Sequence, residues 1–119
     1  EAAAFLHRQV SYRVARVVAV GEGEWSRAFA DELRAAAAKV DFVVPMSGAV
    51  VTFWMPMPKS WSAKMRATMN GKPHQQVPDV DNLAKAFLDA LCGNDCSIWN
   101  ITVEKRWAEY GRIDIRMPA

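Results

Sequence analysis

The sequence has few cysteines and few histidines, and it has no long apolar run. Two Cys and two His occur among its 119 residues. Cys92 and Cys96 are too few for a disulfide framework and favour a reduced state, and His7 and His74 lack the spacing of zinc ligands. No apolar stretch approaches the roughly 20 residues of a membrane span. These absences exclude a disulfide-stapled secreted domain, a zinc domain and a membrane-spanning protein.

Acidic residues are absent from one long stretch of the chain. From Phe42 to Pro78 there is no Asp or Glu, and the first acids after it are Asp79 and Asp81. The basic residues of this stretch are Lys59, Lys64, Arg66 and Lys72. A basic surface that leads into a carboxylate pair suits a metal-dependent nuclease, because cations bind phosphate and carboxylates hold a metal. A solvated loop whose acids happen to lie elsewhere is the alternative that composition leaves open.

Length and composition fit a single folded domain over residues 1–119. Hydrophobic residues make up 51% of the chain and charged residues 24%, which is typical of a globular protein. Alternating apolar and polar residues predict a strand within residues 10–20, and three- and four-residue apolar steps predict a helix from Trp25 to Val40. Ala49 to Met55 is apolar on both faces, as in a central strand.

The second half of the chain predicts a basic connection, a helix and two strands. Prolines after Met55 end the strand, and Ser60 to Met69 suits a short helix. The turn signals that follow predict a mobile, exposed basic segment. An apolar stripe predicts a second main helix from Leu83 to near Gly93, and residues 99–107 and 113–117 alternate like a hairpin. We therefore expect an α+β fold with a small mixed sheet, in the order β-α-β-(basic connection)-α-β-β.

Asp79 and Asp81 are the strongest candidates for a chemical site. Residues two apart share a side only where the backbone is extended. Pro78 disfavours helix before it and the apolar stripe begins at Leu83, so we expect an extended segment with both carboxylates on one side. Such an oxygen-rich pair suits Mg²⁺. The alternative is that the aspartates cap the helix and benefit from its dipole.

Two further residues are candidates for the same site. Lys85 lies four residues after Asp81 on the same helix face, where it forms an intrahelical ion pair or stabilises charge on a phosphate. Asp95 lies in the loop after Gly93 and is the natural third carboxylate, although loop aspartates commonly form turns. Asp89 receives no catalytic role.

The string Asp79-Val-Asp81-Asn-Leu-Ala-Lys85, which runs into Asp89-Ala-Leu91, resembles the signature of the RusA-type Holliday junction resolvases. The resemblance covers roughly Ala49 to the C-terminus. It implies a homodimeric, Mg²⁺-dependent endodeoxyribonuclease, with Mn²⁺ as a substitute, that acts in DNA recombination and repair. Such an enzyme cuts four-way DNA junctions by paired symmetric nicks. It also implies a cytoplasmic protein of bacterial or prophage origin.

Site residues follow from the resemblance position by position. The metal-binding carboxylates of the family fall on Asp79, Asp81 and Asp95, and its essential lysine falls on Lys85. The basic segment before the motif implies DNA contacts from Lys59, Lys64, Arg66, Lys72 and His74. Asn94 departs from the family, which commonly has an acidic pair at this place.

Three alternatives of different classes remain from the sequence. One is a junction-binding protein without catalytic activity, and another is a Mg²⁺ nuclease with broader branched-DNA substrates. The third is an unrelated α+β interaction domain in which Asp79 and Asp81 only cap a helix.

Overall fold

The computed structural model describes residues 11–17, 25–39, 42–92 and 97–117. Their strands are β1 (Ser11–Val17), β2 (Ala49–Pro56), β3 (Ile101–Ala108) and β4 (Gly111–Arg116). Their helices are α2 (Trp25–Lys39), α3 (Ala63–Met69) and α4 (Val80–Cys92). The order of these elements confirms the predicted α+β class and the short helix within the basic connection.

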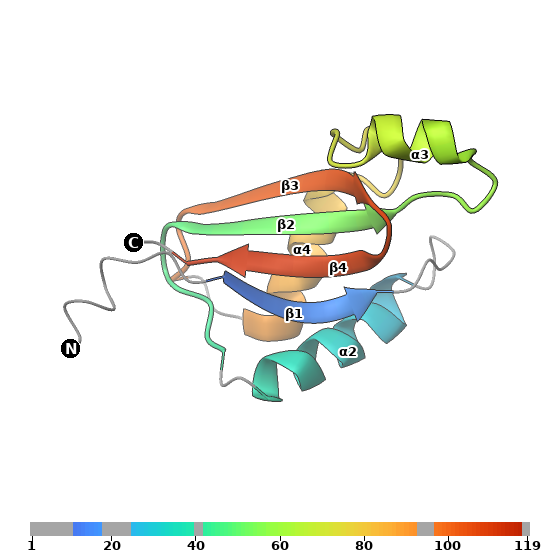
Figure 1. The fold of residues 1–119 in the computed structure, drawn as a ribbon. Coiled ribbons are helices and arrows are strands. Elements are labelled where there is room, and N and C mark those ends of the chain that lie inside the picture. The colour runs from blue at the N-terminus through green and yellow to red at the C-terminus, as the bar shows by residue number, and fades with distance from the viewer. Residues whose placement is uncertain (1–10, 18–24, 40–41, 93–96, 118–119) are drawn as a thin grey trace.

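A mixed sheet in the order β1-β4-β2-β3 organises the molecule. Strand β2 pairs with β4 antiparallel and with β3 parallel, and Figure 1 shows it between those two neighbours. Its Val51 and Phe53 are fully buried. The prediction of a central strand at this place is therefore confirmed. The side chains on one face of β2 are buried, and those on its other face are buried or half-buried.

The predicted hairpin is wrong in its pairing, although both strands are present. Strands β3 and β4 follow one another along the chain across Glu109 and Tyr110, but β2 lies between them in the sheet. Alternation identifies a strand and its buried face, whereas backbone N–H and C=O groups are alike in every strand. The choice of neighbour therefore depends on burying β2, the most apolar strand, at the centre.

Helix α4 covers one face of the sheet, and α2 lies alongside it near β1 (Figure 1). Phe87 on α4 is fully buried and meets Phe53 of β2 edge to face, with 6.3 Å between ring centroids. Leu33 of α2 belongs to the same core, and the Nε of Arg34 donates to the carbonyl of Ala90 at 3.1 Å. This packing fixes α4, the helix that carries the candidate motif, against β2.

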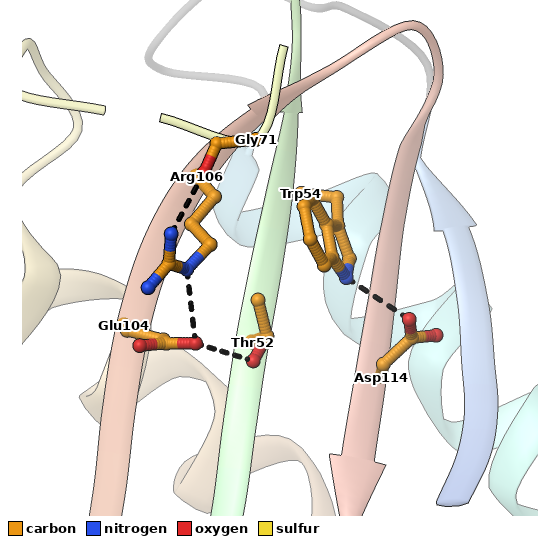
Figure 2. Close-up of polar contacts among 6 residues, drawn as sticks. All are labelled: Thr52, Trp54, Gly71, Glu104, Arg106 and Asp114. Carbon is orange, nitrogen blue, oxygen red and sulfur yellow. Dashed lines mark hydrogen bonds and ion pairs between the residues drawn. The ribbon is translucent and has the colours of Figure 1, made fainter. Parts of the chain in front are cut away.

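The opposite face of the sheet is polar and internally paired. In Figure 2 the hydroxyl of Thr52 points toward Glu104, and the indole of Trp54 points toward Asp114. Thr52 Oγ1 donates to Glu104 at 3.0 Å, and Trp54 Nε1 donates to Asp114 at 2.9 Å. The guanidinium of Arg112 also lies 4.5 Å from the centroid of the Trp54 ring. Alternation along each strand thus separates an apolar face under the helices from a polar one.

No helix in the described ranges is long and apolar enough to cross a membrane.

Candidate active site

The start of α4 places the two candidate aspartates differently from the expectation. The helix begins at Val80, so Asp81 lies in its first turn rather than in an extended segment. Asp79 is the residue just before the helix, and its carbonyl accepts the amide of Leu83 at 3.1 Å. The apolar stripe from Leu83 marks only where α4 meets the core, and the polar first turn before it is helical as well. Negative charge in this turn is favourable to the helix dipole.

Both aspartates nevertheless line one pocket. The pocket is open to solvent and has a volume of about 530 Å³. Its lining comes from the end of the basic connection, the start of α4 and one residue of β3: Gln75, Gln76, Val77, Asp79, Val80, Asp81 and Lys105. Asp79 and Asp81 are exposed, so their carboxylates are available to a ligand from solvent.

Lys105 is a pocket residue that the sequence reasoning missed. Its Nζ donates to the carbonyls of Gln76 at 2.6 Å and Pro78 at 2.7 Å. Burial lowers the pKa of this lysine below its usual value, and the negative charge of Asp79 opposes that shift. A lysine in an alternating strand carries no local signal for such a role, because only the fold brings β3 beside the start of α4.

Of the other two predicted site residues, Lys85 is among the described residues and Asp95 is not. Lys85 lies on α4 and is exposed, one turn after Asp81, as its spacing predicts. Among the described residues it does not line the pocket. Asp95 lies outside the described residues, as does Asn94 beside it, so the third carboxylate stays a prediction.

The segment that leads to Asp79 is tied to the edge of β3, which corrects the expected mobile connection. Gly71 N donates to Trp107 O at 2.9 Å, Trp107 N donates to Lys72 O at 2.9 Å, and His74 N donates to Lys105 O at 3.0 Å. Pro73 forms a bridge with Arg106. The side chain of Arg106 adds a bond of 2.7 Å to the carbonyl of Gly71, as Figure 2 shows. The turn signals located this segment, but they cannot report hydrogen bonds to a distant strand.

His74 is buried, and this does not fit its predicted role as a DNA contact. Its side chain is only 6% exposed, and its ring lies 4.2 Å from that of Trp107. Burial, followed by the nearby charge of Lys105, lowers the pKa of His74 to about 4. A ring that is neutral near pH 7 and enclosed by the protein is a poor phosphate ligand. Its apolar surroundings come from Trp107, which the local sequence does not reveal.

The four predicted basic contacts differ in their surroundings. Lys59, Lys64 and Lys72 are exposed. Arg66 is half-buried, because its guanidinium donates to the carbonyl of Pro58 at 2.7 Å and pairs with Glu109 at 3.2 Å. The three lysines are therefore available to a phosphate backbone, whereas Arg66 connects α3 to the residues that follow β2 and β3.

The donor set at the pocket fits a hard divalent cation. Asp79 and Asp81 offer carboxylate oxygens in a pocket that is open to solvent, and Mg²⁺ is commonly bound by one or two carboxylates with water in its other positions. Within the described part of the chain no group of three or more His, Cys, Asp or Glu residues gathers. A third protein ligand would have to come from residues outside that part, where Asp95 lies.

Comparison with known proteins gives one family match. The model of the family described as "Endodeoxyribonuclease RusA" matches residues 13–118, nearly the whole chain. No curated protein and no solved structure matches at a significant level. The matched range contains the pocket, both strands that flank β2 and all of the predicted site residues.

Proposed function

The chain belongs to the RusA family of endodeoxyribonucleases, and from that premise we propose that it is a Mg²⁺-dependent resolvase of four-way DNA junctions. The family makes the chain an enzyme of DNA recombination and repair that acts on branched DNA, and nucleases of this family depend on divalent metals. The finer proposal is cleavage by paired symmetric nicks with Mg²⁺, for which Mn²⁺ can substitute. The observation that carries it is the shared pocket of Asp79 and Asp81 at the start of α4.

We assign the metal to Asp79 and Asp81, with Asp95 as the third carboxylate. A bound Mg²⁺ supplies Lewis-acid polarisation of the scissile phosphate and activates a water for attack. The protein contributes the placement of these carboxylates, which the start of α4 holds in one pocket. Lys85, one turn further along α4, is the proposed cation for charge that develops on the phosphate.

We propose that DNA approaches over the basic connection. Lys59, Lys64 and Lys72 are exposed on the segment that runs from the end of β2 to the pocket. Their charges neutralise phosphates without reading sequence, as expected for an enzyme that selects a branched shape. Arg66 is left out of this set, because its guanidinium is engaged within the protein.

We propose that the protein acts on the junction as a homodimer. A four-way junction has near two-fold symmetry, so a C₂ dimer presents one active site to each of two strands. One domain of 119 residues would hardly span both cuts. Central β2 has both of its edges paired within the sheet, so the dimer surface lies elsewhere. The family also supports a cytoplasmic setting in a bacterium or prophage.

The decisive experiment compares Asp79→Asn with Asp89→Asn on a synthetic four-way junction. Asp79→Asn is expected to abolish nicking in Mg²⁺ and to keep junction binding, because it removes a metal ligand from the pocket. Asp89→Asn changes an exposed carboxylate on the same helix and is expected to cut like the wild type. Nicking is measured with end-labelled strands, which also show whether the two cuts are symmetric.

Two outcomes would contradict the proposal. A wild-type chain that binds junctions but never nicks them in Mg²⁺ or Mn²⁺ is a junction-binding protein rather than a resolvase. A chain that cuts linear duplex as readily as the junction is a nuclease with broader substrates.

A further inference from the structure

The ammonium of Lys105 donates hydrogen bonds to the backbone at the pocket and lies within the electrostatic influence of Asp79. Its two hydrogen bonds, of 2.6 and 2.7 Å, join Nζ to the carbonyls of Gln76 and Pro78. These carbonyls bracket Val77, and that of Pro78 immediately precedes Asp79. The side chain of Lys105 on β3 thus binds the backbone just before Asp79, the first candidate metal ligand.

The same residue also holds this segment through its main chain. The carbonyl of Lys105 accepts the amide of His74 at 3.0 Å, and His74 is buried against Trp107. His74, Gln76 and Pro78 therefore all attach to Lys105. Strand β3 is in turn fixed by its parallel pairing with the buried strand β2, in which Lys105 pairs with Phe53. Through Lys105, the backbone next to Asp79 is therefore attached to β3, and β3 is paired with the buried strand β2.

These contacts also affect which oxygen atoms are favourable ligands for a cation in the pocket. The carbonyls of Gln76 and Pro78 are hard oxygen atoms that a divalent cation would also accept as ligands. Each accepts a hydrogen bond from the ammonium of Lys105, and this adjacent positive charge disfavours a second cation at the same oxygen. The carboxylates of Asp79 and Asp81, which line the same pocket, remain as donors.

We propose that Lys105 is a positioning residue of the active site, which fixes the backbone of Gln76 to Pro78 so that Asp79 and Asp81 together bind the divalent metal. This role differs from that of Lys85, which does not line the pocket within the described residues. It rests on the proposed function, because it concerns the metal site of that activity. If Lys105 has this role, its loss weakens metal binding and leaves DNA binding unchanged.

The experiment compares Lys105→Met, Lys105→Arg and a matched control. Lys105→Met keeps an unbranched side chain of nearly the same length and removes its donors, whereas Lys105→Arg keeps both charge and donors. Lys39→Met removes an exposed lysine at the end of α2, far along the chain from the pocket. The first readout is Mn²⁺ binding by the DNA-free protein, followed by electron paramagnetic resonance.

Lys105→Met is expected to weaken Mn²⁺ binding by about tenfold or more, the usual effect of losing a residue that orients metal ligands. Lys105→Arg should recover most of the affinity, and Lys39→Met should match the wild type. The second readout is nicking of the junction: Lys105→Met should need more Mg²⁺ for half-maximal rate, with unchanged junction binding in Ca²⁺. If Lys105→Met does not fold, Lys105→Gln is measured in its place.

The proposal is overturned if Lys105→Met binds Mn²⁺ as tightly as the wild type. Lost nicking with unchanged Mn²⁺ affinity would instead make Lys105 a direct contact of the phosphate. The proposed function fails separately: a wild type whose Mn²⁺ site depends on Lys105, but which never nicks junctions, supports the positioning role and refutes the resolvase.

Discussion

At the scale of single residues, His74 combines a buried ring with a neighbouring positive charge. Its Nδ1 is buried and has no hydrogen-bond partner within the described part of the chain. The charged form of the ring would lose hydration there and be repelled by Lys105, which explains why its pKa falls from 6.5 to about 4. The folded state therefore favours the neutral imidazole.

We predict that His74 makes the protein sensitive to mild acid. The pKa in the folded state is lower than in the unfolded chain, so unfolding takes up a proton between the two values. The contribution of the neutral His74 ring to the free energy of unfolding is fully present above pH 6.5. It is lost as the pH falls toward 4. The loss should amount to about 1–3 kcal/mol in the free energy of unfolding, measured by urea unfolding at pH 7.5 and 4.5.

His74→Phe is the control for this prediction, since it keeps a ring against Trp107 and removes the titration. The wild type should lose more stability than His74→Phe between the two pH values. Equal losses in both proteins would mean that the carboxylates, and not the histidine, cause the acid sensitivity.

At the scale of elements, α4 depends on its contact with β2. Phe87 is fully buried and packs on Phe53, so Phe87→Ala leaves a cavity beneath the helix. We expect it to lower the free energy of unfolding by about 3–5 kcal/mol. Asp89→Ala, on the exposed side of α4, should change it by roughly 0.5 kcal/mol or less. Urea unfolding measures both, and a loss in Phe87→Ala no larger than in Asp89→Ala would show that the two rings do not anchor α4.

The connection before α4 contains one residue that needs glycine for its backbone. Gly71 has a φ of +83°, and a Cβ added there would meet nothing within 4 Å. Gly71→Ala should therefore cost about 1 kcal/mol through backbone strain alone. Gly71→Asn should cost less, because Asn tolerates this region better. Thermal unfolding compares the two, and an alanine variant as stable as the wild type would show that the segment adopts another conformation.

At the scale of the whole molecule, the uneven distribution of charge matters more than the net charge of +2. The proposed DNA-binding lysines lie in the acid-free stretch, and exposed phosphate contacts give a strong salt dependence. We predict that Lys64→Ala lowers the slope of log K against log salt concentration by about 0.9 for each phosphate it contacts. Junction binding is measured in the Asp79→Asn background, where cleavage is absent.

Arg66→Ala is the control for Lys64→Ala, because Arg66 lies in the same acid-free stretch but is engaged within the protein. It should leave the salt slope nearly unchanged and lower thermal stability, because Arg66 holds the carbonyl of Pro58 and the carboxylate of Glu109. If Arg66→Ala changed the slope as much as Lys64→Ala, the guanidinium would have to leave these partners to reach DNA.

The candidate site was predictable from sequence where its residues are close along the chain. Asp79, Asp81 and Lys85 belong to one short string, and local spacing relates them directly, although the start of α4 was expected three residues too late. Lys105 and the burial of His74 were not predictable. Both depend on β3 running beside the connection, which is a contact between segments far apart in the sequence.

The sequence by itself determined the α+β class, the place of nearly every element and the family to which the chain belongs. These depend on periodicity, turn residues and one motif, all of which act over a few neighbouring residues. The tertiary structure alone decided that β2 separates β3 from β4, that the basic connection is bound to β3, and that Lys105 reaches the backbone before Asp79. Backbone hydrogen bonds are the same for every residue, so the partners of a strand are chosen by burial of the whole core and not by the strand's own sequence.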